Sequence, residues 1–196
     1  MQPIEFTTIE TARLRLRRFG DADLPAFIAY RNDPDVARYQ SWDGISEAEA
    51  VAFVREQQTA PAGEPGEGLQ IAVERKDSGR LIGDCFFKVV EDDPRQAEIG
   101  YTLAREAQGH GFATEAVAAL LTWAFPTFDL HRVIAITDVK NTASVALLER
   151  LGLRREAHFR ENIWFKGAWG DEYLYAILRD EWSGARQAST PGTDAS

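Results

Sequence analysis

One stretch near the middle of the chain, residues 108–115, reads Gln-Gly-His-Gly-Phe-Ala-Thr-Glu. It follows an alternating apolar run that predicts a strand at residues 97–103, and it opens a run typical of a helix at residues 111–125. Two glycines and an alanine at this junction allow the backbone to turn tightly and approach a ligand closely. The first N–H groups of a helix have no partners within it, and the helix dipole is positive at that end. The stretch therefore predicts a strand–loop–helix unit that binds phosphate.

The spacing of the glycines in this stretch excludes two common kinds of phosphate-binding site. The chain has no G-x-x-x-x-G-K-[ST] motif, which excludes the loop of a P-loop NTPase. Gly109, Gly111 and Ala113 do not fit the dinucleotide-binding pattern either, because Asp129 falls before the next strand rather than at its end. The loop fits [QR]-x-x-G-x-[GA], with Gln108 in first place. This is the pyrophosphate-binding motif of the acetyl-coenzyme A dependent N-acetyltransferase (GNAT) superfamily, although so short a pattern also fits a glycine-rich turn without a ligand.

Further motifs occur in the order found in one branch of that superfamily. The chain resembles the RimJ/RimL-like branch, the ribosomal-protein N-terminal acetyltransferases and their relatives, over roughly residues 8–182. The motifs are Glu10-Thr-Ala-Arg-Leu-Arg-Leu-Arg-Arg-Phe19, Arg31-Asn-Asp-Pro-Asp-Val36, Leu81-Ile-Gly-Asp84, Glu98-Ile-Gly-Tyr101, Asn141-Thr-Ala-Ser144, Leu148-Glu-Arg-Leu-Gly-Leu153 and Gly167-Ala-Trp-Gly-Asp171.

The length, composition and net charge indicate which type of protein this is. With 196 residues, 44% hydrophobic and 27% charged, the chain suits one globular domain, which we place at residues 8–182, followed by a disordered tail at 183–196. A single cysteine, no signal-peptide pattern and no apolar run of about twenty residues predict a cytoplasmic protein that does not enter a membrane. The formal net charge of −9 argues against nucleic-acid binding. That charge suits a cationic amine substrate, and it equally suits a merely soluble surface.

The pattern of apolar residues and turns predicts a mixed α+β fold. We expect a single GNAT-like domain with a central, mostly antiparallel sheet of about seven strands and about four flanking helices. The resemblance implies that the sheet splays into a V-shaped cleft. Strands are predicted at 13–18, 69–75, 80–90, 97–103, 132–137, 153–159 and 173–178, and helices after Asp23, after Ser46, at 111–125 and at 142–151.

The resemblance also implies acetyl-coenzyme A as co-substrate, with no metal ion. Its pantetheine arm would pair with the backbone around Tyr101, Leu103 and Ala104, and Asn141 would contact the arm or simply cap its helix. Residues implied to bind the pyrophosphate are Gln108, Gly109, His110, Gly111, Phe112, Ala113 and Thr114. The three histidines show no metal-ligand spacing.

The chain departs from the common superfamily pattern at the expected catalytic acid. Leu148 stands where many members have a tyrosine that protonates the leaving thiolate, and Ser144 stands where they have an alanine. Ser144 is therefore a candidate acid, or alternatively a helix serine bonded to the carbonyl one turn back. Glu98 is the leading candidate base and Glu161 the second, although either can merely pair with a surface arginine. The resemblance implies a bulge in the fourth strand that presents the N–H of Leu103 to the oxyanion.

The acceptor is less defined than the donor. Trp42, Glu161 and Trp164 are candidates for lining the acceptor pocket, although packing in the core or at its rim is the better explanation for the tryptophans. We expect direct transfer of the acetyl group in a ternary complex, to a protein N-terminal α-amine or a small-molecule amine, by a monomer or homodimer. The alternative is a catalytically silent module that binds coenzyme A, which the missing tyrosine at Leu148 keeps open.

Overall fold

The structure is a computed structural model that describes residues 4–182. The tail predicted at 183–196 therefore lies outside the described residues. The helices and strands follow in the order β1 (Ile9–Glu10), β2 (Leu14–Arg17), η1 (Asp21–Asp23), α1 (Leu24–Arg31), α2 (Pro34–Ala37), α3 (Glu47–Thr59), β3 (Gly68–Arg75), β4 (Arg80–Val89), β5 (Gln96–Leu103), η2 (Arg105–Ala107), α4 (Phe112–Thr127), β6 (Arg132–Asp138), α5 (Thr142–Arg150), β7 (Arg154–Phe165) and β8 (Ala168–Leu178).

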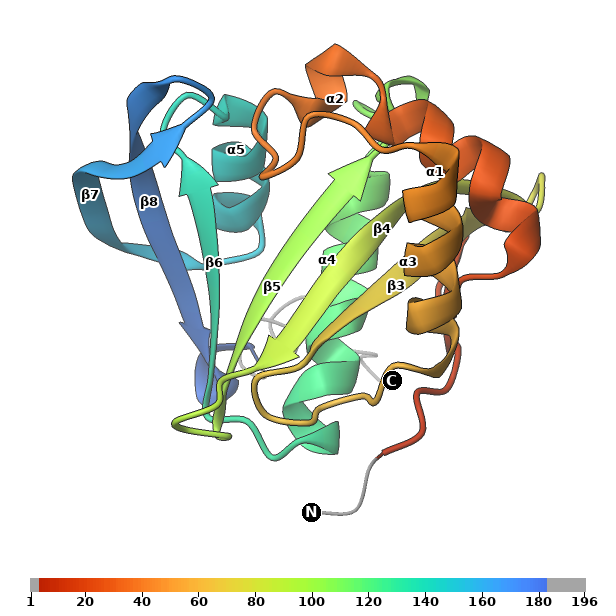
Figure 1. Cartoon of the computed structure of the whole chain (residues 1–196). Helices are drawn as coiled ribbons and strands as arrows, with labels where there is room; N and C mark the ends of the chain where they lie inside the picture. The colour runs from red at the N-terminus through yellow and green to blue at the C-terminus, as the bar shows by residue number, and fades with distance from the viewer. Residues whose placement is uncertain (1–3, 183–196) are drawn as a thin grey trace, which may run out of the picture.

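The strands form one open sheet in the order β1-β2-β3-β4-β5-β6-β8-β7. All neighbouring pairs are antiparallel except β5 and β6, which are parallel. These two strands pair only where Gln96–Glu98 meets Arg132–Ile134, and beyond that point they diverge (Figure 1). The mixed sheet and its V-shaped opening are thus confirmed.

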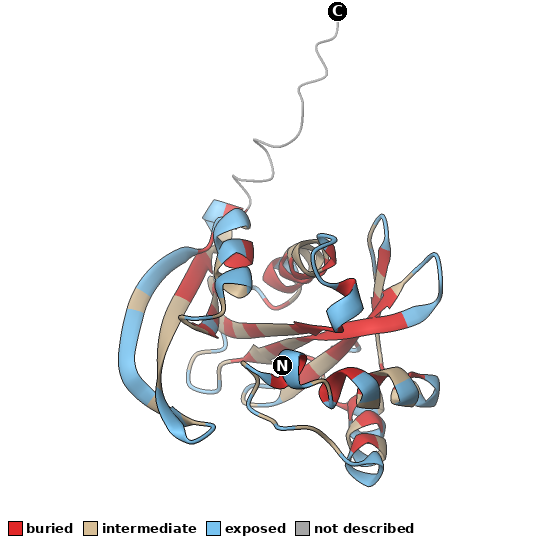
Figure 2. Ribbon diagram, turned by 90° about the horizontal axis from the view of Figure 1, so that it is seen from above, coloured by how far each residue is buried: buried red, intermediate tan, exposed pale blue. Residues whose placement is uncertain are grey.

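Helices cover both faces of the sheet, with buried residues between the layers (Figure 2). Helices α1 and α3 share a cluster with Phe19, Ala72 and Leu81 on one face. Helices α4 and α5 pack on the other face, in a larger cluster that includes Phe87, Val133 and Tyr175. The buried side of α4 is apolar along its whole length, with small and branched residues in the middle and Phe112 and Phe125 towards the two ends.

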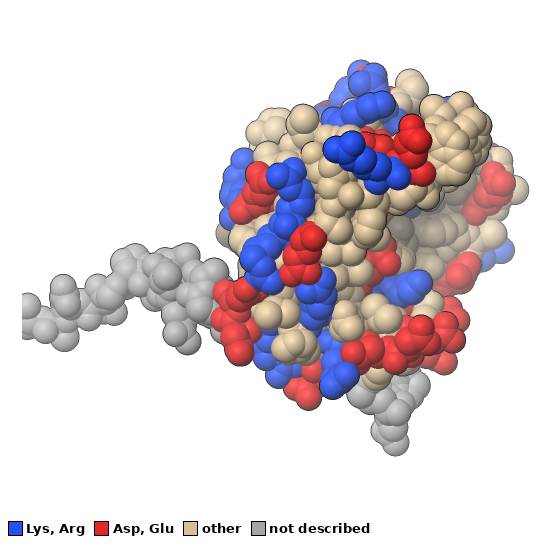
Figure 3. Space-filling model, turned by 90° about the vertical axis from the view of Figure 1, so that its left-hand side faces the viewer, with Lys and Arg blue, Asp and Glu red and all other residues tan. Residues whose placement is uncertain are grey.

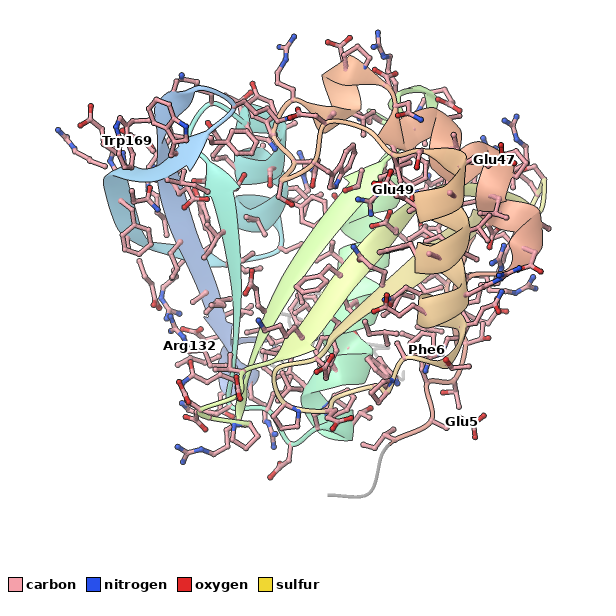
Figure 4. All side chains as sticks on the ribbon, viewed as in Figure 1. Glu5, Phe6, Glu47, Glu49, Arg132 and Trp169 are labelled. Atoms are coloured by element: carbon pink, nitrogen blue, oxygen red, sulfur yellow. The ribbon has the colours of Figure 1, made fainter. Side chains whose placement is uncertain are left out.

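Local signals explain where several helices begin. Ser46 accepts from the N–H of Glu49 at 3.3 Å, and the Glu49 carboxylate accepts from the N–H of Ser46 at 2.8 Å, so α3 begins with a capping box. Glu49 is labelled in Figure 4. Asn32 is the C-cap of α1, and Asp33 then caps a further four-residue helix, α2, which begins at Pro34. Proline suits a first helical position because its missing N–H would have no partner there.

Three element boundaries differ from the sequence predictions by more than one residue. Helix α4 continues through Pro126 to Thr127, and it ends where the N–H of Phe128 bonds to the carbonyl of Ala124 at 3.1 Å. Strands β7 and β8 are longer than predicted because they are joined by a two-residue turn, Lys166 and Gly167, at φ 48° and 83°. Positive φ at both positions matches the turn type whose twist continues two antiparallel strands.

A buried polar cluster ties α1 to β4. The hydroxyl of Tyr30 donates to the Asp84 carboxylate, and a guanidinium nitrogen of Arg31 lies 3.5 Å from the same oxygen. Burial raises the pKa of Asp84 above its usual value, against the opposing effect of Arg31. The Arg31 guanidinium also packs over the ring of Trp42, 4.4 Å from its centre. The cluster fixes the end of α1 and therefore the start of α2.

The outer face of β7 and β8 carries basic and acidic side chains beside one another (Figure 3). Arg132 lies 2.6 Å from Glu156, and Arg154 lies 2.8 Å from the same carboxylate. The net negative charge is therefore not gathered into one acidic patch on this face. Among residues 4–182, no helix has the length and apolar character needed to cross a membrane.

Candidate active site

The loop between η2 and α4 forms a cradle of backbone amides. Gly109 and Gly111 adopt φ values of 77° and 78°, a left-handed conformation that glycine enters without the steric cost of a Cβ. The amide N–H groups of residues 109–114 donate no hydrogen bond to any residue in the described part of the chain. Six successive unpaired donors at a helix N-terminus are suited to binding an anion.

A carboxylate in the first turn of α4 holds this loop to the start of β2. Glu115 accepts from the Thr11 hydroxyl at 2.6 Å, from the Arg13 N–H at 2.9 Å and from the Arg13 Nε at 2.6 Å. Arg13 Nη1 donates in turn to the carbonyl of His110 at 3.0 Å. Partial burial opposes ionisation, but these hydrogen bonds outweigh it and lower the pKa of Glu115 below its usual value. We call Thr11, Arg13 and Glu115 the loop clamp.

The end of β5 exposes backbone groups to the opening of the V. The N–H of Ala104 bonds to the carbonyl of Ile82, on the β4 side, at 2.9 Å. Because backbone groups alternate along a strand, those of Tyr101 and Leu103 point the other way, where β6 has diverged. Gln108 Nε2 donates to the Leu103 carbonyl on that side at 3.0 Å.

The bulge expected in this strand is absent from its ladder with β4. The register runs without a shift from the pair Gly83–Leu103 to the pair Val89–Ala97. That part of the prediction is wrong, because the strand edge is freed by the divergence of β6 and not by an inserted residue.

A cavity of about 460 Å³ joins these parts. Its walls come from both arms of the V: α2 and the following residues, the end of β5, the loop, the first turn of α4, and α5. The predicted site residues on its wall are Tyr101, Leu103, Gln108, Gly109, Gly111, Phe112, Ala113, Thr114, Asn141 and Ser144. Arg150 also lines the cavity and lies 3.4 Å from the Thr114 hydroxyl, which places a cation beside the unpaired amides.

Helix α5 brings two of the predicted polar side chains to the cavity. Asn141 caps the helix, since its Oδ1 accepts from the N–H of Ser144 at 3.2 Å. The hydroxyl of Ser144 lies 2.7 Å from that of Tyr101 on β5. Leu148, at the position of the missing tyrosine, is fully buried in the core.

The remaining candidates lie away from the cavity wall. Glu98 is half-buried at the last pair between β5 and β6, and strand alternation turns it to the face opposite Tyr101. Glu161 is exposed at an irregular position of β7, with φ 45°. Trp164 is 62% exposed and contacts Trp169 on the β7–β8 hairpin (Figure 4).

Three other predicted positions do not line the cavity. Trp42 packs on Arg31, and its carbonyl accepts from Lys166 at 3.1 Å. The ring of His110 stacks on Phe112, while its backbone N–H is one of the six unpaired donors of the loop. Ala104, at the end of β5, is bonded to β4.

Comparison with known proteins agrees with this geometry. The family model for the acetyltransferase (GNAT) domain matches residues 13–154. The chain belongs to the GNAT acetyltransferase family. It is therefore an acyltransferase by family, as the sequence predicted.

Relatives of the chain extend over most of its length. The uncharacterized N-acetyltransferase YnaD of Bacillus subtilis is 34% identical, over 89% of this chain and 99% of its own. A solved GNAT-family acetyltransferase of Bacillus anthracis is 31% identical, with a TM-score of 0.79 over 89% of this chain and 100% of its own. The [ribosomal protein uS5]-alanine N-acetyltransferase of Escherichia coli is 30% identical, over 56% of this chain and 57% of its own. The resemblance to the RimJ/RimL-like branch is thus confirmed.

A more distant structure shows the same fold. The spermidine N-acetyltransferase of Vibrio cholerae, solved with coenzyme A and spermine, has a TM-score of 0.74 at 24% identity, over 88% of this chain and 99% of its own.

Sequence reasoning missed three contributors to the site. Arg150 lies within the Leu148-Glu-Arg-Leu-Gly-Leu153 motif, which was used only as a sign of the branch. Glu115 and Arg13 also lie in quoted stretches, but their contact joins residues 102 positions apart. The one local signal for this contact was an acidic residue, Glu115, in the first turn of the predicted helix.

Proposed function

We propose that this protein transfers the acetyl group of acetyl-coenzyme A to a primary amine by direct attack in a ternary complex. One observation carries the proposal: the unpaired amides of residues 109–114 and the free edge of β5 open into the same cavity. A diphosphate fits the amides, and an extended amide-containing arm fits a strand edge that lacks a partner. Few other ligands combine a diphosphate with an extended arm that contains amides.

The residues of the cavity support particular roles. The side-chain nitrogen of Asn141 has no partner among the described residues and is available to the pantetheine amides. Arg150 adds positive charge for the phosphates. The N–H of Leu103 faces the opening of the V and is available to the carbonyl oxygen of the acetyl group, as an oxyanion donor.

The chemistry requires a neutral amine. Its nitrogen lone pair attacks the thioester carbon, the carbon–sulfur bond breaks with its electron pair moving to sulfur, and the nitrogen loses a proton. A lysine-like amine with a pKa of about 10.4 is almost wholly protonated at pH 7, whereas an α-amine at about 7.7–8.0 is partly neutral. We assign the proton-accepting role to Glu98, directly or through water, because it lies at the point where β5 and β6 part.

The names of two relatives suggest the chemical class of the acceptor. One relative is named for the N-terminal alanine of a ribosomal protein, and a structural neighbour for spermidine. We therefore propose an α-amine or a small polyamine-like amine as the acceptor class.

The test is thiol release from acetyl-coenzyme A. The assay uses an alanine-initiated peptide, spermidine, and the same peptide with a blocked N-terminus as the matched control. Amine-dependent release supports the proposal. Calorimetric binding of coenzyme A without release for any amine would instead favour the silent binding module, and the absence of binding would refute both.

A further inference from the structure

Two hydroxyl groups meet across the cavity, from different arms of the V. The Tyr101 hydroxyl on β5 and the Ser144 Oγ on α5 are 2.7 Å apart, and both residues line the cavity. The Tyr101 hydroxyl also lies 3.4 Å from the backbone carbonyl of Ser144, at the limit of a hydrogen bond. Within the described residues, the Ser144 Oγ has no other hydrogen-bond partner, so it is not bonded to the carbonyl one turn back.

The direction of this hydrogen bond decides what Ser144 can do. A phenol is more acidic than an aliphatic alcohol and is the better donor, and both nearby acceptors of Tyr101 belong to Ser144. With Tyr101 donating, the Ser144 hydroxyl keeps its own proton for a further acceptor. Burial raises the pKa of Tyr101 to about 12, so the phenol stays protonated at neutral pH.

We propose that Tyr101 positions the Ser144 hydroxyl to donate a hydrogen bond to the sulfur of coenzyme A as the thiolate leaves. The inference rests on the proposed function and adds a residue to it. Tyr101 is a positioning residue, since it acts through Ser144. Leu148, at the position where a tyrosine would donate to the sulfur, is buried in the core and has no donor. In this protein Ser144 is the donor, and Tyr101 on β5 orients it.

Relative acidities limit the role to hydrogen bonding. A thiol has a pKa of about 8.5, well below that of an alcohol or of a buried phenol, so a full proton transfer from Ser144 to the thiolate is uphill. The hydroxyl pair therefore stabilises the developing negative charge and loses no proton. The thiolate takes its proton from water on release, and the amine loses its own to the base, so protons and electrons balance.

Five variants test the pair: Tyr101→Phe, Ser144→Ala, the double variant that combines these two, Ser144→Thr, which keeps a hydroxyl, and Ser144→Thr combined with Tyr101→Phe. Tyr175→Phe is the matched control, because the Tyr175 hydroxyl also bonds to α5, at Glu149 Oε1 (2.9 Å), and neither residue lines the cavity. Single-turnover rates are measured so that product release does not mask the chemical step. Calorimetry with coenzyme A and thermal unfolding report binding and folding.

Loss of a hydrogen bond to the leaving group predicts an about 10- to 100-fold lower rate for Ser144→Ala. Tyr101→Phe lowers it about 3- to 10-fold, because the hydroxyl remains but is less well directed. The double variant matches Ser144→Ala, since Tyr101 acts only through Ser144. Ser144→Thr keeps most of the rate and stays sensitive to Tyr101→Phe. Affinity for coenzyme A changes less than about twofold in all of them, and Tyr175→Phe behaves as wild type.

Two results would overturn the inference while leaving the proposed function intact. One is an active wild type whose rate is unchanged by Tyr101→Phe. The other is a Tyr101→Phe effect that is equally large with and without the Ser144 hydroxyl. A wild type that releases no thiol with any amine would overturn the proposed function, and the inference with it.

Discussion

Removing the carboxylate of the loop clamp tests whether the amide cradle is held in place by β2. The change is Glu115→Ala. It deletes three hydrogen bonds at once, from the Thr11 hydroxyl, the Arg13 N–H and the Arg13 guanidinium. It also removes a negative charge from the first turn of α4, where the helix dipole favours one.

The expected cost follows from the exposure of each partner. A hydrogen bond to a charged group contributes about 1.5–3 kcal/mol, but the Arg13 side chain is 49% exposed, so that ion pair contributes only about 0.2–1 kcal/mol. Water can also reach the freed donors in part, and the losses are not additive. We therefore expect a loss of about 2–3 kcal/mol in the free energy of unfolding, or about 4–12 °C in Tm for a chain of this size.

Binding of coenzyme A should weaken in the same variant. The His110 carbonyl is held by Arg13, so without the clamp the loop must be ordered by the ligand. Ordering about one backbone residue costs about 1–2 kcal/mol, which corresponds to a roughly tenfold higher Kd. Glu10→Ala is the control: Glu10, in β1, pairs with Arg15 in β2 and with Lys76 after β3, but it is 47% exposed, so both the Tm and the Kd should stay close to wild type.

The pH dependence gives an independent check. The pKa of Glu115 is lowered below its usual value of 4.5, so its contribution to stability is fully present above pH 4.5. As the pH falls through the folded-state pKa, the carboxylate is protonated and that contribution is lost. The difference in unfolding free energy between wild type and Glu115→Ala should therefore shrink in acid. A difference that stayed constant from pH 7 to pH 3, or a variant with unchanged Tm and Kd, would refute the reasoning.

Substitutions at three further positions test other parts of the fold. Gly111→Ala forces a Cβ into a left-handed position, at φ 78°, at a cost of about 1–2 kcal/mol, and should weaken coenzyme A in calorimetry; unchanged binding would contradict the proposed loop. Asn141→Ser keeps a helix cap but removes the side-chain amide, so this variant should bind coenzyme A more weakly at a near-normal Tm. Asn141→Ala should bind it more weakly and also lose about 0.5–2 kcal/mol in the free energy of unfolding. If both variants bound coenzyme A as tightly as wild type, the role of Asn141 would be limited to capping α5. Asp84→Asn leaves the buried Arg31 guanidinium without a charged partner and should cost about 3–5 kcal/mol in urea unfolding; a loss below about 1 kcal/mol would show that the pair contributes little.

The parts of the fold that could be predicted are those that local sequence determines. The loop after β5 is an example, because only glycine enters a left-handed conformation freely, and two glycines spaced two apart can be read directly. The capping box at Ser46 is another, since both of its bonds lie within four residues. Order and type of the main elements followed from such signals.

The parts that could not be predicted depend on contacts between distant residues. Tyr101 was assigned to the cofactor through its backbone alone, because its hydroxyl meets Ser144 only after β5 and α5 face each other across the V. Arg13 was predicted only as the first residue of a strand, and its contact with Glu115 depends on how α4 packs against β2. The length of the last hairpin was missed for a different reason, since lysine is not a typical residue for the first position of its turn.

The alternation of side chains along β5 separates the two halves of the proposed reaction. Tyr101 lies on the face covered by α5, where the amide cradle, Ser144 and Arg150 also line the cavity. Glu98 lies on the opposite face, the one covered by α1 and α3, at the point where β6 leaves the sheet. If Glu98 accepts the proton as proposed, a change of acceptor can occur on one face without disturbing the donor site on the other. Acceptor selectivity should accordingly be sought around Glu98 and the opening of the V, and not in the loop at residues 108–115.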